Sequence, residues 1–228
     1  MKLVYDGKTK IVYELSDGNY LLKFKDDACG KDGVFDPGEN QVGLTIEGKG
    51  VAVLKLSDFF FRKINEAGFP THFVDCDVSK AEMTVRPATV FGKGIEVVCR
   101  YKAGGSFIGR YGDYIKAGET LFPPIVEITL KDDERGDPPI THHTLVLLGI
   151  LRESEYDVLV NLVREISDVL KSECSQKGLD LLDLKLEFGR DREGKIMLID
   201  EVSGDVMRVA DKDGNLIEPL KLTEILIG

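Results

Sequence analysis

Two segments with helical periodicity, set among short runs that alternate like β-strands, restrict this chain to a mixed α+β fold. The first helix is predicted over residues 51–67, where apolar residues recur every three or four positions before Gly68. The second is predicted from Glu153 or Ser154, either of which can cap it, to about Lys177. Its expected apolar face comprises Val158, Leu159, Leu162, Val163, Ile166, Val169 and Leu170.

Strand-like runs occupy much of the remaining sequence. Residues 1–45 read as strands and turns, except that 26–33 is expected to be a loop because its glycines and aspartates favour turns. Further strands are predicted within 71–101 and 124–130, and a hairpin over 181–199. We therefore expect two lobes. Residues 1–84 would form an antiparallel, β-rich N-terminal lobe, and residues 85–228 a mixed α/β C-terminal lobe.

The composition excludes several classes of protein. Forty acidic residues against 30 basic ones give a net charge of −10, which argues against a nucleic-acid partner. No apolar run is long enough to cross a bilayer, and the N-terminus is charged too early for a signal peptide, so a cytoplasmic location is expected. The widely spaced Cys29, Cys76, Cys99 and Cys174 indicate neither a zinc site nor a disulfide framework.

A first candidate site is the stretch Gly7-Lys8-Thr9-Lys10 between two predicted strands. Glycine allows the backbone to approach a ligand closely, and lysines at alternate positions of a strand point in the same direction. This arrangement suits a polyphosphate. Taken alone, however, the motif favours solvated lysines at a hairpin, which are the commoner case.

A second candidate is the predicted strand that carries Asp183, Lys185 and Glu187 on one face and apolar residues on the other. The next strand ends at Asp200, which would place a second carboxylate beside Glu187. Two hard oxygen ligands with room for phosphate and water suit Mg²⁺. A solvent-facing, salt-bridged sheet would show the same pattern.

A third candidate is the glycine-rich turn between Arg100 and Ser106, with Arg110 four residues later. Arginine can bind phosphate through two parallel hydrogen bonds, and the turn adds a hydroxyl group. An anion-binding loop is the functional interpretation, and an ordinary loop with exposed basic residues is the alternative. A similar turn precedes Arg208.

Together, and in this order, these segments resemble the phosphoribosylaminoimidazole-succinocarboxamide synthase (SAICAR synthetase) family. The similarity extends over nearly the whole chain. The matching stretches are 5–10, 24–27, Ile46-Glu47-Gly48-Lys49-Gly50, 65–68, 100–106, 131–133, 136–138 and Asp183-Leu184-Lys185-Leu186-Glu187-Phe188-Gly189.

The resemblance implies a two-lobed fold related to ATP-grasp enzymes and kinases, with the substrate and metal site between the lobes. It implies an ATP-dependent ligase of purine biosynthesis that joins carboxyaminoimidazole ribotide to L-aspartate through an acyl phosphate, giving SAICAR, ADP and phosphate. No covalent enzyme nucleophile is needed. Family members often form dimers or larger assemblies, so a homo-oligomer is expected.

The resemblance also implies residue roles. ATP would be bound by Gly7, Lys8, Thr9, Lys10, Lys131, Glu187 and Asp200. Mg²⁺ would be held by Glu187 and Asp200. The ribotide would be bound by Glu96, Arg100, Ser106, Asp183, Lys185 and Arg208, of which Asp183, Lys185 and Arg208 are also the expected catalytic residues.

Some positions differ from the family pattern. Residues 51–55 are mostly apolar where the family has an asparagine pair, Thr141-His142-His143 replaces another polar pair, and the chain stops at Gly228 where the family continues into a further helix. The histidines are expected to be exposed loop residues. These differences leave open a related amide ligase with another carboxylate or amine, and a nucleotide-binding protein without catalysis.

Overall fold

The computed structural model describes residues 1–31, 33–35 and 41–228. The helices are α1 (Lys49–Glu66), α2 (Ser106–Tyr111), α3 (His142–Leu147), α4 (Glu153–Gln176) and α5 (Pro219–Ile227), with short 3₁₀ turns at Val78–Lys80 and Asp133–Arg135. The strands are β1 (Lys2–Asp6), β2 (Lys10–Glu14), β3 (Tyr20–Phe24), β4 (Asp27–Lys31), β5 (Val34–Phe35), β6 (Val42–Thr45), β7 (Phe73–Asp77), β8 (Glu82–Val85), β9 (Thr89–Val90), β10 (Ile95–Lys102), β11 (Thr120–Leu130), β12 (Asp180–Arg190), β13 (Ile196–Ile199) and β14 (Met207–Ala210). The predicted α+β class is confirmed.

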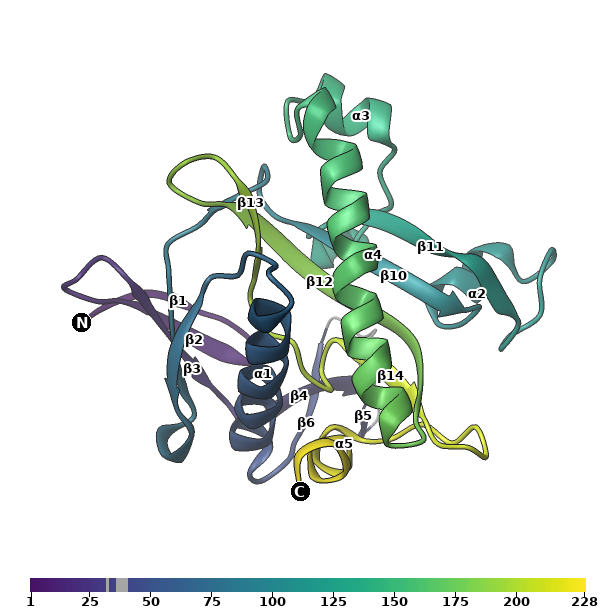
Figure 1. Cartoon of the computed structure of the whole chain (residues 1–228), viewed down its shortest axis with the longest axis horizontal. Coiled ribbons are helices and arrows are strands. Elements are labelled where there is room, and N and C mark those ends of the chain that lie inside the picture. Colours follow the sequence, from purple (N-terminus) through teal and green to yellow (C-terminus); the bar gives the residue numbers. More distant parts are fainter. Residues whose placement is uncertain (32, 36–40) are drawn as a thin grey trace.

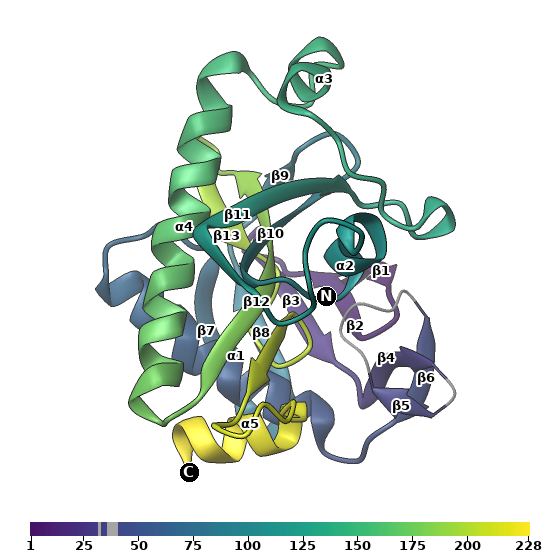
Figure 2. The same ribbon diagram turned by 90° about the vertical axis from the view of Figure 1, so that its right-hand side faces the viewer.

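Within the described residues, the strands form three antiparallel sheets (Figures 1 and 2). One has the order β1-β2-β3-β8-β7, and a small sheet has the order β5-β4-β6. The largest has the path β11-β10-β12-β13, with β14 and β9 also paired to β12. The first sheet ends with β8 at Val85, next to the predicted lobe boundary at residue 84. The division into two lobes stays a prediction, because a continuous buried cluster joins α1 and its sheet to α4 and the β10–β12 sheet.

Helix α4 crosses one face of the largest sheet, as Figure 2 shows. Leu159, Val163, Ile166 and Leu170 are fully buried, as the periodicity predicts, whereas Val158 is 53% exposed, so its assignment to the apolar face was wrong. The predicted caps were also wrong. The helix begins after Arg152, whose backbone N–H donates to the carboxylate of Glu155 at 2.7 Å.

Helix α1 packs against the N-terminal sheet and against α5. Its first turn is capped from a distance, because the Asp26 carboxylate accepts hydrogen bonds from Gly48 N and Gly50 N at 3.1 and 2.9 Å. The helix ends as predicted at Gly68, which has a φ of 89°.

Two local expectations were wrong. The segment 26–33 contains β4, whose backbone pairs with β5 and β6 and whose Ala28 is fully buried; Asp32 of that segment lies outside the described residues. His142 begins α3 instead of lying in a loop, because Thr141 caps that helix, and its ring stacks on Tyr156 with centroids 3.9 Å apart. In both cases tertiary pairing overrides a local preference for turns.

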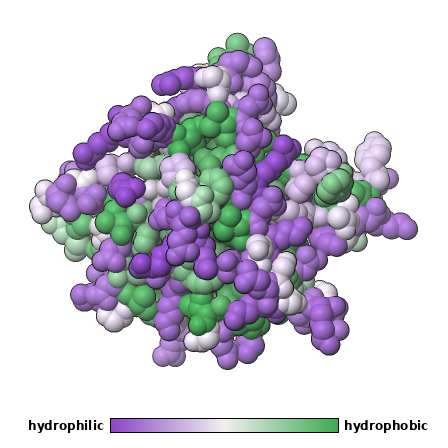
Figure 3. Space-filling view, in the orientation of Figure 1, coloured by the Kyte–Doolittle hydropathy of each residue, from purple (hydrophilic) through white to green (hydrophobic). Residues whose placement is uncertain are grey.

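Figure 3 shows a mostly hydrophilic face with hydrophobic patches scattered over it. No helix in the described part of the chain is both long and apolar enough to cross a bilayer.

We expect Leu159→Ala to lower the free energy of unfolding by about 2–5 kcal/mol, because it leaves a cavity between α4 and the sheet. Val158→Ala, one position along the same helix and exposed, should change it by less than about 0.5 kcal/mol. Urea unfolding of both variants checks this. Equal effects at the two positions would contradict the assigned orientation of the helix.

His72 should make stability depend on pH. Burial lowers the pKa of His72 from 6.5 to about 4, against a hydrogen bond from its Nε2 to the carbonyl of Asp200. The unfolded chain therefore binds more protons between pH 6.5 and 4, so stability is present above pH 6.5 and is lost as the pH falls, by up to about 3 kcal/mol. Urea unfolding across this range should show a smaller loss for His72→Gln. Parallel curves for the two proteins would refute the assignment.

Candidate active site

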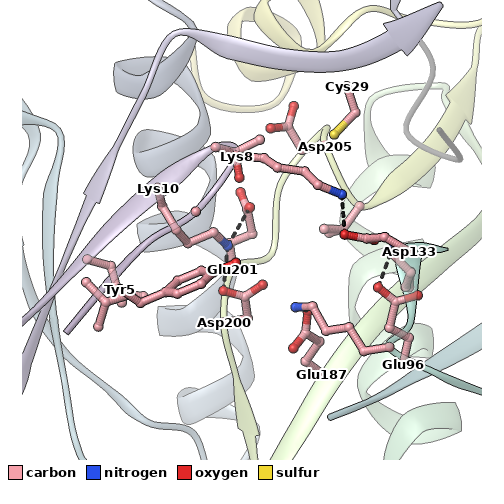
Figure 4. A pocket seen from close by; sticks show the side chains of 17 residues that line it. Tyr5, Lys8, Lys10, Cys29, Glu96, Asp133, Glu187, Asp200, Glu201 and Asp205 are labelled. Atoms are coloured by element: carbon pink, nitrogen blue, oxygen red, sulfur yellow. Dashed lines mark hydrogen bonds and ion pairs between the residues drawn. The ribbon is translucent and has the colours of Figure 1, made fainter. Parts of the chain in front are cut away.

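A cavity of about 310 Å³ lies where the β1–β2 turn meets the face of β12 and the segment that follows β13 (Figure 4). The turn contributes Gly7 to Lys10, and β12 contributes Lys185 and Glu187. The segment after β13 contributes Asp200, Glu201 and Asp205. Residues far apart in the sequence, most of them charged, thus line one open pocket.

The β1–β2 turn places two lysines in this cavity. Gly7 N donates to the carbonyl of Lys10 at 2.9 Å, and a side chain at Gly7 would lie 2.7 Å from the Tyr5 ring, so the exposed ring would have to move to accommodate it. Lys8 and Lys10 both line the cavity, as their alternate positions predict. Lys8 pairs with Asp133 on the opposite wall. The two ammonium groups are therefore held apart, each against carboxylate.

The alternation predicted for β12 is confirmed. Lys185 and Glu187 line the cavity, while Leu184 and Leu186 are buried in the core on the other face. Lys185 pairs with Glu96 of β10 at 2.9 Å. On the same face, Lys131 pairs with Glu187 at 2.5 Å.

Asp200 is held in a strained position at the end of β13. Its φ is 69°, in the left-handed region that few non-glycine residues adopt. The carbonyl of Asp200 is fixed by His72 at 2.9 Å, and its carboxylate lies 2.5 Å from Lys10 Nζ. Lys10 also contacts Glu201 at 2.9 Å. Strain of this kind persists where surrounding contacts enforce it, and it gathers at functional sites.

Glu187 and Asp200 differ in their electrostatic surroundings. Burial, and then the charge of Asp200, raise the pKa of Glu187 to about 7. For Asp200, burial acts in the same direction, but the Lys10 and Lys131 ammonium groups outweigh it and hold its pKa well below its usual range. Burial lowers the pKa of Lys10, but the neighbouring carboxylates of Asp200 and Glu201 outweigh burial and raise this pKa above its usual value. The site therefore brings carboxylate and ammonium groups close together. A bound cation could contact the carboxylates, and a bound anion could contact the ammonium groups.

Four other predicted site residues form a separate arginine cluster and are not among the residues that line the cavity. Arg100 donates to Ser106 Oγ at 3.0 Å and to Asp183 at 3.3 Å. Arg208 donates twice to the same Asp183, at 2.9 and 2.8 Å. Asp183 thus orients both guanidinium groups while remaining 5% exposed.

The glycine-rich turn before Ser106 lies against this cluster. Gly105 has a φ of 53°, and a side chain there would overlap the guanidinium of Arg208. Glycine therefore lets the backbone and an arginine share one small space. Arg100 also donates to Glu127 at 2.6 Å, and Glu127 in turn contacts Arg110 at 2.5 Å.

Several residues of the site were not predicted. Glu201 and Asp205 follow Asp200 closely, and Asp133 lies two residues after Lys131, so proximity to predicted residues was the available signal. Glu127 sits on a strand whose pairing with β10 is visible only in the structure. No group of three or more histidine, cysteine or acidic side chains in the described residues is arranged to hold a metal by itself.

Comparison with known proteins agrees with this geometry. The sequence model of SAICAR synthetase matches residues 3–219. A phosphoribosylaminoimidazole-succinocarboxamide synthase from Clostridium tetani is 56% identical over 228 residues, which is all of both chains.

Solved structures give the same result. A SAICAR synthetase in complex with ADP has a TM-score of 0.84 and 32% identity, over 95% of this chain and 88% of the other. A phosphoribosylaminoimidazole-succinocarboxamide synthase from Ehrlichia chaffeensis has a TM-score of 0.85 and 28% identity, over 95% and 89% of the two chains. With the match over residues 3–219 and the full-length relative, these likenesses show that the chain belongs to the SAICAR synthetase family.

Proposed function

We propose that this chain catalyses the reaction of its family, joining carboxyaminoimidazole ribotide to L-aspartate with ATP, in the cavity and the arginine cluster described above. The observation that carries the proposal is the order of charged groups along one strand. On β12, Glu187, Lys185 and Asp183 follow one another at alternate positions, from the cavity to the arginine cluster. This order provides adjacent places for a nucleotide, a carboxylate and a second phosphate.

The ATP phosphates would lie at the β1–β2 turn. Lys8, Lys10 and Lys131 supply positive charge, and the backbone of Gly7 and Thr9 allows close approach. Each of the three lysines is paired with a carboxylate in the structure, so phosphate oxygens would replace or join existing partners. The proposed role of the lysines is to offset charge on the phosphoryl group in transfer.

Glu187 and Asp200 fit Mg²⁺. Both are partly buried hard oxygen donors that line the cavity, and the negative charge of Asp200 helps to raise the pKa of Glu187. A divalent cation would relieve that repulsion, with phosphate and water completing its coordination. When bound, it would neutralise charge on the phosphate oxygens.

The ribotide would span from the cavity to the arginine cluster. Its phosphate would be bound by Arg100, Ser106 and Arg208, with Asp183 orienting both arginines. Its carboxylate would lie near Lys185, which Glu96 holds in position. Lys185 and Arg208 would thus touch the substrate, while Asp183 acts through the arginines.

The chemistry then needs chiefly positioning. The ribotide carboxylate attacks the terminal phosphorus of ATP, ADP leaves, and the resulting acyl phosphate is attacked by the amine of L-aspartate with loss of phosphate. No side chain forms a covalent bond with the substrate. We further propose that the protein works in the cytoplasm, as a homo-oligomer. The assay that tests the function follows ADP release and product mass from Mg-ATP and the ribotide, with and without L-aspartate.

Asp200→Asn should reduce turnover more than about a hundredfold, because it removes a charged metal ligand. The fold should survive, since asparagine tolerates the left-handed backbone and Glu201 still neutralises Lys10. Steady-state kinetics and a thermal melt check both points. Asp157→Asn, the same change on the exposed face of α4, is the control. Normal turnover by Asp200→Asn would remove this residue from the site.

Arg100→Lys should raise KM for the ribotide about tenfold or more, because a point charge replaces a fork and hydrogen bonds to charged groups contribute about 1.5–3 kcal/mol. KM for ATP should change little. Arg164→Lys on the exposed surface of α4 is the matched control. An unchanged KM for the ribotide would count against phosphate binding by the arginine cluster.

A further inference from the structure

Asp205 is a buried carboxylate in the cavity wall to which no role has yet been assigned. Its side chain is 9% exposed and lines the cavity near Lys8 and Cys29 (Figure 4). Among the described residues, its one ionic partner is Lys49, and neither carboxylate oxygen accepts a hydrogen bond of regular geometry. Burying a carboxylate costs free energy when few hydrogen bonds compensate for the lost water, so such a group calls for an explanation.

The surrounding structure holds Asp205 rigidly. Its backbone N–H donates to Ser203 Oγ at 3.1 Å, and Ser203 Oγ donates to Glu201 at 2.9 Å. Gly204 is packed so closely on Pro219 of α5 that a side chain there would lie 2.7 Å from the Pro219 Cα. The carboxylate is therefore preorganised by contacts outside the cavity.

The register of the sheet places Asp205 beside Lys185, where the ribotide carboxylate is proposed to lie. Lys185 N donates to the carbonyl of Val206 at 2.7 Å, so the turn bearing Asp205 lies beside Lys185. Lys185 in turn lies between Glu187 at the metal end and Asp183 at the arginine cluster. An acyl phosphate formed between those two ends would thus have Asp205 on one side.

Charge distinguishes Asp205 from the other acids of the cavity. Asp200, Glu201, Glu187, Glu96 and Asp133 each pair with a lysine that also lines the cavity. Lys49, the partner of Asp205, is only 1% exposed, is also bound to the Asp27 carbonyl at 2.8 Å, and is not among the residues that line the cavity. Lys49 therefore supports Asp205 from outside the cavity, while Asp205 itself lines the cavity with both carboxylate oxygens buried.

We propose that Asp205 binds the ammonium group of L-aspartate and accepts one of its protons, which frees the nitrogen lone pair to attack the acyl phosphate. This inference rests on the proposed function. The C–N bond forms as the C–O bond to phosphorus-bound oxygen breaks. One proton passes from nitrogen to Asp205 and then to water, and a second leaves with the phosphate. Burial, and then the charge of Glu201, raise the pKa of Asp205 to about 6, which increases its affinity for a proton while leaving it ionised at neutral pH.

The test compares L-aspartate with hydroxylamine, which is already neutral near pH 7 and converts acyl phosphates to hydroxamates. Asp205→Asn keeps the size of the side chain and an oxygen for Lys49, but it cannot accept a proton. We expect kcat/KM for L-aspartate to fall about a hundredfold or more, with hydroxamate formation from Mg-ATP and the ribotide near the wild-type rate. Hydroxamate formation also shows that the variant is folded and binds both substrates. Asp205→Glu should recover part of the L-aspartate reaction, and Asp157→Asn should match the wild type.

The outcomes separate the two proposals. Wild-type protein that forms no succinocarboxamide product overturns the proposed function and this inference together. An active wild type with an Asp205→Asn variant that uses L-aspartate equally well overturns only the role of Asp205. The same holds if the variant loses the L-aspartate and hydroxylamine reactions in equal proportion, because the role would then be structural.

Discussion

The contact of Lys10 with Asp200 and Glu201 is the interaction on which the arrangement of this protein depends. It joins the N-terminal sheet, through β2, to the segment that leaves β13. Lys10 is the cation of a largely buried ionic cluster whose acids are Asp200 and Glu201. Separating the two sheets would therefore leave these charges without partners. The same contact also places an ammonium group beside Asp200, whose backbone is in the left-handed region. One interaction thus supports both the fold and the site.

The arginine cluster works by a different physical principle. Its guanidinium groups are held by Asp183 and Glu127 from neighbouring strands, so little conformational freedom remains to be lost on binding an anion. Two acids restrain three arginines, Arg110 included, and the cluster keeps an excess of positive charge in an acidic protein. The structure thus shows how a sheet builds a local basic site in a chain whose net charge is −10.

The sequence predicts those parts of the fold whose signal is periodic and local. The long helices, the two-faced strand with Lys185 and Glu187, and the turn at Gly7 follow from spacing alone. The strand β4 was missed because its stability comes from partners elsewhere in the chain, whereas the cap at Arg152 is a local contact with Glu155 that the helical periodicity does not reveal. In the site, the family pattern supplied the residues, but spacing could not show that Arg100 and Arg208 share one carboxylate. It also could not show that Lys49 supports Asp205, since that contact joins residues from the two ends of the chain.

Helix α5 gains significance from its contact with Gly204. The end of the chain packs against α1 and, through Pro219, directly against the turn that positions Asp205. Thr223 adds a hydrogen bond to the carbonyl of Ala52 in the first turns of α1. The C-terminal helix therefore supports, from outside, the wall of the cavity that carries Asp205. Substitutions in α5 would therefore reach the carboxylate proposed to bind the amine without changing any residue that lines the cavity.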